Sequence, residues 1–191
     1  MWSAVLLAGG RGSRLGGRHK PGISVAGRTL LDRALDAVRG ADAIVVVGPT
    51  RPVCGQVLWT MEQPRGGGPL AALAAGLTAL PGEPDQIALL AADLTGVTAH
   101  TVDRLRAALA AGADGAVLSD ASGHRQWLIS VWRAAALRAA LPAEPEGRSL
   151  RSVLAGLSVV EVPELPGESA DVDTPADLAR YLAGPSEGHL A

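Results

Sequence analysis

The sequence predicts an α/β protein built on a mostly parallel sheet, and three observations lead to this prediction. Ala43 to Gly48 is a continuous apolar run that ends in Gly-Pro, which is typical of a parallel strand covered on both faces. Leu30 to Arg39, just before it, carries leucine and alanine at helical spacing. The chain has 191 residues, enough for one domain with a sizeable core. We therefore expect a single domain over residues 1–183, with residues 184–191 as a disordered tail.

The first predicted strand, Ser3 to Ala8, stops at Gly9-Gly10 and is followed by a loop rich in glycine and basic residues. Glycine lets backbone N–H groups approach phosphate oxygens closely, and Arg14 and Lys20 can neutralise phosphate charge. The loop is not a Walker A motif, because Pro21 follows Lys20 where Ser or Thr is required, and it lacks the third glycine of a dinucleotide fingerprint. We interpret it as a phosphate-binding loop; the alternative is a glycine-rich turn with solvated arginines.

Further strands and helices alternate along the rest of the chain. Thr29 is expected to cap the helix that begins at Leu30, and Thr98 the helix that begins at Ala99. Pro69 suits the first turn of an alanine- and leucine-rich helix, and three glycines before it allow a ligand to approach the helix N-terminus; a flexible loop without a ligand is the alternative. The other expected strands are 57–60, 86–93, 115–119, 126–132 and 159–163, and the expected helices are 30–39, 70–80, 99–111, 134–141, 149–157 and 175–182.

Composition narrows the classes of function. The formal net charge is −2 and the sequence pI is near 6.1, so we expect no binding to nucleic acid or membrane. The longest apolar stretches, such as Leu70 to Leu80, are too short to span a bilayer, and no signal peptide precedes the first strand, which predicts a cytoplasmic protein. The single cysteine, Cys54, excludes an intramolecular disulfide, and the four histidines lack the spacing of a metal site.

Three acidic residues stand where a metal ion could be bound. Asp93 ends a predicted buried strand, and ligands of open parallel sheets bind beyond the carboxyl ends of strands. A carboxylate there can hold Mg²⁺ against a nucleotide phosphate; alternatively, Asp93 caps the next turn. Asp171 and Asp173 alternate in an extended segment, which predicts side chains that point the same way. The alternative is that Asp171 is exposed and Asp173 caps the helix that follows.

Four motifs in one order resemble those of the molybdenum-cofactor guanylyltransferase group of nucleotidyltransferases: Leu7-Ala-Gly-Gly-x-x-x-Arg14-Leu-Gly-x-x-x-Lys20-Pro, Gly68-Pro69-Leu, Asp93, and Asp171-x-Asp-Thr-Pro-x-Asp-Leu. The resemblance extends from Ala4 to Leu182. It implies a three-layer α/β/α Rossmann-like fold. It also implies Mg²⁺-dependent transfer of a nucleoside monophosphate from a nucleoside triphosphate to a phosphate acceptor with release of pyrophosphate, and GTP and molybdopterin are the favoured substrates.

The resemblance also implies roles for individual residues. Arg14, Lys20 and Asp93 are the expected catalytic residues, and Mg²⁺ would be held by Asp93 together with Asp173 or Asp171. Catalysis would then rest on positioning and charge stabilisation. The residues expected to bind the nucleotide are Leu7, Ala8, Gly9, Gly10, Arg14, Lys20, Glu62, Gly68, Pro69 and Asp93.

Four positions depart from the family's pattern. Gly48 stands where Asn often follows the second strand, and Glu62 where Asp precedes the Gly-Pro segment. Thr95 replaces the proline of Asp-x-Pro, and Trp127 replaces the proline of a Gln-Pro pair on the acceptor side. These departures leave the nucleobase and the acceptor open. The alternatives are a molybdopterin cytidylyltransferase, a nucleotidyltransferase for another phosphorylated acceptor, and a non-catalytic nucleotide-binding regulatory module. We expect a monomer or a weak oligomer.

Overall fold

The computed structural model describes residues 1–9, 24–25, 27–109 and 112–171, in which seven strands form one sheet and two form a hairpin. The hairpin consists of β2 (Ser24–Val25) and β3 (Arg28–Thr29). The strands of the sheet are β1 (Trp2–Leu7), β4 (Ala43–Val47), β5 (Leu58–Thr60), β6 (Gln86–Ala91), β7 (Gly115–Ser119), β8 (Arg125–Arg133) and β9 (Val159–Pro163). The helices are α1 (Leu30–Ala37), α2 (Pro69–Ala79), α3 (Ala99–Leu109), α4 (Ala134–Ala140) and α5 (Leu150–Leu154).

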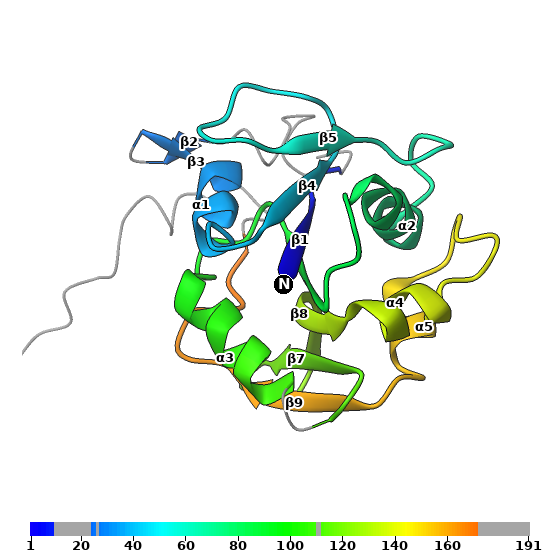
Figure 1. Ribbon diagram of the computed structural model, residues 1–191. Helices are drawn as coiled ribbons and strands as arrows, with labels where there is room; N and C mark the ends of the chain where they lie inside the picture. Colours follow the sequence, from blue (N-terminus) through cyan, green and yellow to red (C-terminus); the bar gives the residue numbers. More distant parts are fainter. Residues whose placement is uncertain (10–23, 26, 110–111, 172–191) are drawn as a thin grey trace, which may run out of the picture.

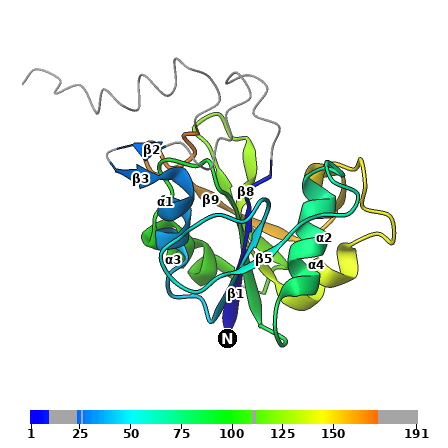
Figure 2. The same cartoon turned by 90° about the horizontal axis from the view of Figure 1, so that it is seen from above.

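The sheet lies between two layers of helices. Helices α1 and α3 cover one face, and α2, α4 and α5 cover the other (Figure 1). The same two layers are seen when the molecule is viewed from above (Figure 2). The predicted three-layer α/β fold is therefore confirmed.

The strand order is β5-β4-β1-β6-β8-β7-β9. Neighbouring strands are parallel, except that β8 runs antiparallel to both β6 and β7. The sheet is thus mostly parallel, as predicted, with one reversed strand that the sequence did not indicate. β1 is an inner strand, and its Leu7 pairs with Val47 of β4 on one side and with Ala91 of β6 on the other.

Two apolar clusters, one on each face of the sheet, form the core. Alternate residues of β1 contribute to them: Ala4 and Leu6 pack on the side of α1 and α3, and Val5 and Leu7 pack on the side of α2. This alternation follows from the period of two of a β-strand. Burying one leucine or valine side chain contributes about 1.5–3 kcal/mol. The unbroken apolar strands therefore stabilise both interfaces between sheet and helices.

The predicted helix caps are confirmed by hydrogen bonds. Thr29 accepts the N–H of Asp32 through Oγ1 at 3.0 Å, and Asp32 accepts the N–H of Thr29 at 3.0 Å, so the two residues form a capping box. Thr98 accepts the N–H of Thr101 at 3.4 Å at the start of α3. Several elements are shorter than predicted, and α5 has five residues instead of the expected nine.

Some predictions concern residues that the structure does not describe. They are the loop over residues 10–23, the helix over 175–182 and the tail over 184–191. The single-domain boundary at residue 183 also stays a prediction.

Candidate active site at the carboxyl edge of the sheet

β1 and β6 are neighbouring parallel strands at the point where the order of the sheet reverses. From β1 the chain continues outward to β4 and β5, whereas β6 leads to the strands on the other side (Figure 1). Open α/β sheets bind ligands beyond the carboxyl ends of their strands at such a point. Leu7 pairs with Ala91, so Gly9 and Asp93 lie two residues beyond the last pair on neighbouring strands.

Backbone hydrogen bonds fix the way in which the chain leaves these two strands. The N–H of Ala8 donates to the carbonyl of Val47 at 2.8 Å, and the N–H of Ala92 donates to the carbonyl of Leu7 at 3.0 Å. Strand β6 therefore ends at Ala91, and Asp93 lies in the loop that follows instead of at the end of the strand, where the sequence analysis put it. The loop residue is still at the carboxyl edge, where ligand chemistry is expected.

The end of β4 approaches the end of β1 closely at Gly48. Gly48 has a φ of +153°, and a Cβ built there would lie 2.9 Å from the carbonyl carbon and oxygen of Ala8. Its N–H donates to the carbonyl of Thr60 at 2.9 Å, which joins the ends of β4 and β5. The close contact explains physically why a side chain such as Asn is absent at this position in this chain.

Residues 164–171 fold back across the loop that follows β6. Leu94 and Asp171 form an isolated antiparallel bridge. Thr95 donates twice to the carbonyl of Ala170, from its N–H at 2.9 Å and from its hydroxyl at 3.0 Å. The structure thereby brings the backbone of Asp171 beside the residue that follows Asp93.

A close contact between two glycines supports the same arrangement. A Cβ built on Gly96 would lie 1.8 Å from the carbonyl oxygen of Gly167, so only glycine allows the two segments to approach this closely. The loop after β6 and the segment 164–171 are therefore held together at three successive positions, 94, 95 and 96.

A buried carboxylate attaches this segment to α3. Glu168 is 5% exposed. Its Oε1 accepts from the Thr101 hydroxyl at 2.7 Å and from Arg104 at 2.9 Å, and its Oε2 accepts from Arg104 and from the N–H of Leu165, each at 2.7 Å. Burial raises the pKa of Glu168, but the hydrogen bonds from Thr101, Leu165 and Arg104 together outweigh it and hold the pKa below its ordinary value. Arg104 also donates to the carbonyl of Pro163.

The segment before α2 forms a further part of the same edge, beyond β5. Glu62 accepts the N–H of Gly66 at 3.0 Å through Oε1. Gly68 precedes the helix with a φ of +94°, and Pro69 is the first helical residue, as predicted. The carbonyl of Gly67 accepts the N–H of Gly147 at 2.9 Å. The turn that carries Glu62 is therefore held against the loop before α5.

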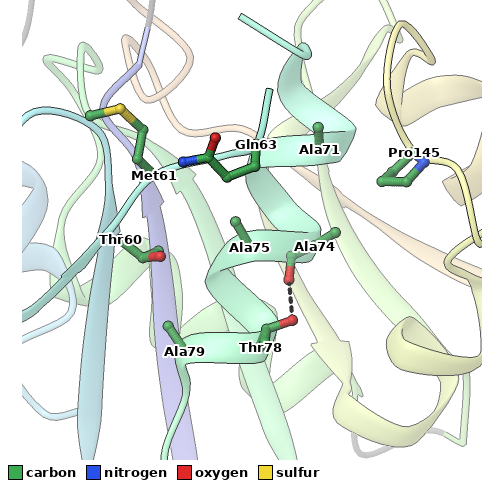
Figure 3. A pocket seen from close by; sticks show the side chains of 9 residues that line it. All are labelled: Thr60, Met61, Gln63, Ala71, Ala74, Ala75, Thr78, Ala79 and Pro145. Atoms are coloured by element: carbon green, nitrogen blue, oxygen red, sulfur yellow. Dashed lines mark hydrogen bonds between the residues drawn. The ribbon is translucent and has the colours of Figure 1, made fainter. Parts of the chain in front are cut away.

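A groove of about 370 Å³ runs along α2, and Figure 3 shows its lining side chains. The Thr78 hydroxyl donates to the carbonyl of Ala74 in the same helix at 2.9 Å. None of the lining side chains is charged, so the groove offers no counter-charge for a triphosphate. The lining residues are Thr60, Met61, Gln63, Ala71, Ala74, Ala75, Thr78, Ala79 and Pro145.

Strand β8 begins at the carboxyl edge because it runs antiparallel to its neighbours. Its register with β7 shifts between Val117, which pairs with Ser130, and Leu118, which pairs with Gln126. The residues of β8 between these two pairs, including Trp127, therefore form a bulge, and bulges re-aim side chains at the ends of sheets.

Two tryptophans and a buried serine stabilise this bulge. The indole N–H of Trp132 donates to Ser130 Oγ at 2.8 Å, and the Ser130 hydroxyl donates to the carbonyl of Trp127 at 2.8 Å. The ring of Trp127 stacks on that of Trp132 with centroids 6.4 Å apart. Trp127 is thus held in a defined position at the start of β8.

The side chain of Gln126 forms a hydrogen bond within the turn between β7 and β8. Its side-chain amide donates to Asp120 Oδ2 at 2.7 Å. The N–H of His124 is the main cause that holds the pKa of Asp120 below its ordinary range, and the amide of Gln126 and the N–H of Ser122 add to this effect against partial burial. The turn therefore carries an ionised carboxylate.

The structure thus brings together part of the residue set expected from the sequence. Leu7, Ala8, Gly9, Asp93 and Asp171 lie at the adjoining ends of β1 and β6. Gly68 and Pro69 lie at the start of α2, and Glu62 lies in the turn between β5 and α2. Gly10, Arg14, Lys20 and Asp173 lie outside the described residues. The sequence identifies Thr95 only as a departure from the family's pattern, and it does not reveal the contribution of Glu168, Thr101 and Arg104. No local pattern signals Glu168, because its partners on α3 are more than sixty positions earlier in the chain.

The described acidic residues fit Mg²⁺ better than a metal that needs a complete protein cage. Within residues 1–9, 24–25, 27–109 and 112–171, no group of three or more His, Cys, Asp or Glu side chains could hold a metal ion. Asp93 and Asp171 are two carboxylate residues on segments that the Leu94–Asp171 bridge joins. Mg²⁺ commonly binds one or two carboxylates and completes its octahedron with water and substrate phosphates. The donor set at this edge therefore fits Mg²⁺ bound together with a nucleotide.

The mostly parallel sheet between two layers of helices is the α/β fold of nucleotidyltransferases. Residues 4–162 match the model of the MobA-like NTP transferase domain. The chain belongs to the MobA-like NTP transferase family.

Two curated proteins illustrate the relationship in sequence. The chain is 34% identical over 172 residues to the bifunctional protein GlmU of Xanthobacter autotrophicus, covering 80% of this chain and 38% of that protein. It is 40% identical over 79 residues to the molybdenum cofactor guanylyltransferase of Acidiphilium cryptum, covering 39% of this chain and 40% of that protein. The matches thus span about two fifths of the length of each curated relative.

Solved structures share the fold over nearly the whole chain. Molybdopterin-guanine dinucleotide biosynthesis protein A from Archaeoglobus fulgidus superposes with a TM-score of 0.72 at 20% identity, covering 95% of this chain and 97% of that one. The 2-C-methyl-D-erythritol 4-phosphate cytidylyltransferase of Thermus thermophilus superposes with a TM-score of 0.68 at 20% identity, covering 94% and 96%. At these identities the likeness establishes the fold alone. None of the described helices combines the length and the apolar character that crossing a bilayer requires.

Proposed function

We propose that this protein transfers a nucleoside monophosphate from a nucleoside triphosphate to a phosphorylated acceptor in a Mg²⁺-dependent reaction that releases pyrophosphate. GTP and molybdopterin are the favoured substrates, and the cytoplasm is the expected compartment. The observation that supports the proposal most strongly is the junction of β1 and β6, where Gly9, Asp93 and Asp171 lie at one edge of the sheet. A triphosphate needs backbone donors and a carboxylate-bound cation at one place, and this edge can supply both.

In the proposed mechanism, the backbone of residues 7–10 binds the triphosphate, and Arg14 and Lys20 neutralise its charge. Asp93, with Asp171 or Asp173, would hold Mg²⁺, which neutralises the charge that develops on the phosphates. An oxygen of the acceptor phosphate attacks the α-phosphorus in line. A new P–O bond forms while the bond from the α-phosphorus to the bridging oxygen breaks, and pyrophosphate leaves with the electron pair. The chain contributes positioning and electrostatic stabilisation rather than a nucleophile.

Transfer of a cytidylyl group is the second candidate. Gly48 provides no side chain beyond β4 to contact a base, and Glu62 already accepts a backbone N–H from Gly66. Both features weaken the expectation of guanine recognition and favour testing CTP beside GTP. The alternative to an enzyme is a regulatory module, which would bind a nucleotide without releasing pyrophosphate.

Calorimetric titration with GTP, CTP, ATP and UTP, each with and without Mg²⁺, tests the proposal. Preference for GTP supports guanylyl transfer, and preference for CTP supports the second candidate.

Pyrophosphate release with molybdopterin then tests turnover. Asp93→Ala should abolish this release, whereas Asp103→Ala, which removes an exposed acid from α3, should not. Lys20→Ala and Arg14→Ala should each weaken triphosphate binding by about 1–3 kcal/mol. Absence of binding by all four nucleotides would refute the proposal.

A further inference from the structure

We infer that Thr95 and Glu168 are positioning residues that fix Asp171 relative to Asp93 and thereby set how strongly Mg²⁺ promotes nucleotide binding. The inference rests on the proposed function. It concerns two side chains that would touch neither the nucleotide nor the metal ion, because each acts through the segment 164–171.

Thr95 joins the two acidic segments through hydrogen bonds to the carbonyl of Ala170. It follows Asp93 by two residues, and its acceptor, the carbonyl of Ala170, immediately precedes Asp171. The N–H and the hydroxyl of Thr95 donate to this one carbonyl at 2.9 and 3.0 Å. A proline at position 95, the residue that the family's pattern has here, carries neither donor. This chain therefore couples the two segments through hydrogen bonds that proline would abolish.

Glu168 secures the segment 164–171 to the body of the protein. Its four hydrogen bonds reach Thr101 and Arg104 on α3 and the N–H of Leu165. Glu164 adds two more, because its carboxylate accepts the N–H groups of Ala121 and Ser169 at 3.0 and 3.1 Å. The segment is therefore fixed at both ends, and Asp171 follows directly from it.

The position of the second carboxylate matters because Mg²⁺ tolerates little distortion. The ion demands nearly ideal octahedral geometry with short bonds to oxygen, and a site works only when its ligands are held by supporting contacts. If the segment 164–171 loosens, Asp93 stays in the loop after β6, but the second carboxylate must be ordered at the moment of binding. The nucleotide should then still bind without Mg²⁺, while the gain in affinity from Mg²⁺ falls.

The test measures nucleotide affinity by calorimetry in EDTA and in saturating Mg²⁺; the ratio of the two affinities is the Mg²⁺ gain. The probe is GTP, or CTP if CTP is the nucleotide that binds. Thr95→Val, which removes the hydroxyl but keeps the N–H, should lower the gain about three- to tenfold, the scale of one hydrogen bond. Thr95→Pro and Glu168→Gln should lower it further, and Thr95→Ser should restore it. Affinity in EDTA should not change.

Thr78→Val is the matched control, because the Thr78 hydroxyl also donates to a backbone carbonyl at 2.9 Å but lies in α2, away from Asp93. Hydrogen exchange supplies a readout that needs no nucleotide. Exchange of the Thr95 amide and of residues 164–171 should accelerate in Thr95→Val and Glu168→Gln and not in Thr78→Val.

The outcomes separate this inference from the proposed function. If the native protein shows no Mg²⁺ gain, both the proposed function and this inference are overturned. If the native protein shows the gain and Thr95→Pro and Glu168→Gln retain it, only the positioning role is overturned. A loss of affinity that is equal in EDTA and in Mg²⁺ would indicate a purely structural contribution and would also overturn it. If Glu168→Gln does not fold, Thr95→Val still decides the question.

Discussion

Replacement of Arg104 by methionine should destabilise the protein severely, because it leaves a buried carboxylate without its cation. The Arg104 and Glu168 side chains are 22% and 7% exposed, and their closest N–O distance is 2.7 Å. Breaking a buried ion pair by removing one partner costs about 3–5 kcal/mol. Thr101 and the N–H of Leu165 still donate to Glu168, so we expect a loss of about 3 kcal/mol in Arg104→Met. This is a large share of the roughly 5–15 kcal/mol that stabilises a typical domain.

The lowered pKa of Glu168 predicts how the loss of stability in Arg104→Met changes with pH. In the native protein the pKa of Glu168 lies below its ordinary value of 4.5, so its contribution is fully present above that pH and is lost as the pH falls through the lowered value. Arg104→Met removes the hydrogen bonds and the positive charge by which Arg104 helps to lower the pKa of Glu168, so burial raises this pKa against less opposition and the carboxylate is protonated more easily in the folded state. The deficit in unfolding free energy should therefore be largest near neutral pH and should shrink toward acid pH.

Urea unfolding followed by tryptophan fluorescence, at neutral pH and near the ordinary pKa of a carboxyl group, measures both effects. Arg28→Met is the matched control, because Arg28 pairs with Asp36 at 2.5 Å but the two side chains are 51% and 50% exposed. An exposed pair contributes about 0–1 kcal/mol. The reasoning is refuted if Arg104→Met costs no more than Arg28→Met, or if its deficit is the same at both pH values.

Three further substitutions test local features of the fold. Ser130→Ala should cost about 1–3 kcal/mol in urea unfolding, because the buried indole N–H of Trp132 loses its acceptor; an unchanged midpoint would contradict this. Gly48→Asn should cost about 1–3 kcal/mol, because of its φ of +153° and the approach to Ala8, and a variant of native thermal stability would show that the turn adapts. Thr29→Ala should cost about 1 kcal/mol through loss of the capping box, whereas an equal loss in Thr29→Ser, which can still cap α1, would contradict that explanation.

The architecture could be predicted from the sequence wherever the pattern is local. Apolar runs that end in glycine indicated β1 and β4, and the helical spacing after Thr29 indicated α1, because strand and helix periods differ. The reversed direction of β8 could not be predicted in this way. A strand with the same alternation fits a sheet in either direction, and the bulge that reorients Trp127 depends on Ser130 and Trp132 packing inside the folded protein.

The candidate site was predictable only in its parts that follow strand ends. Asp93 could be recognised because it comes directly after an apolar run, and Asp171 because acids alternate in its segment. The contact between the two segments depends on the carbonyl of Ala170 and on the Gly96–Gly167 approach, and neither has a local sequence signal. Glu168 likewise looks like a solvated acid in a turn until α3 surrounds it with Thr101 and Arg104. The roles of all the predicted site residues stay predictions, and Gly10, Arg14, Lys20 and Asp173 also lie outside the described residues.

Because β1 is an inner strand, its two neighbours in the sheet are completed at different times during synthesis. β1 and β4 are synthesised well before β6: Ser3 pairs with Ala43 of β4 on one side, and its partner on the other side, Ile87, is made later. Until β6 is made, the β1–β4 pair exposes an unpaired strand edge that is apolar except at Ser3, and such edges invite pairing with other chains. Pairing between distant strands is also slow, because the loop between them must close first. The nascent chain is therefore most prone to aggregate before β6 emerges, and slower translation upstream of β6 would prolong that exposure.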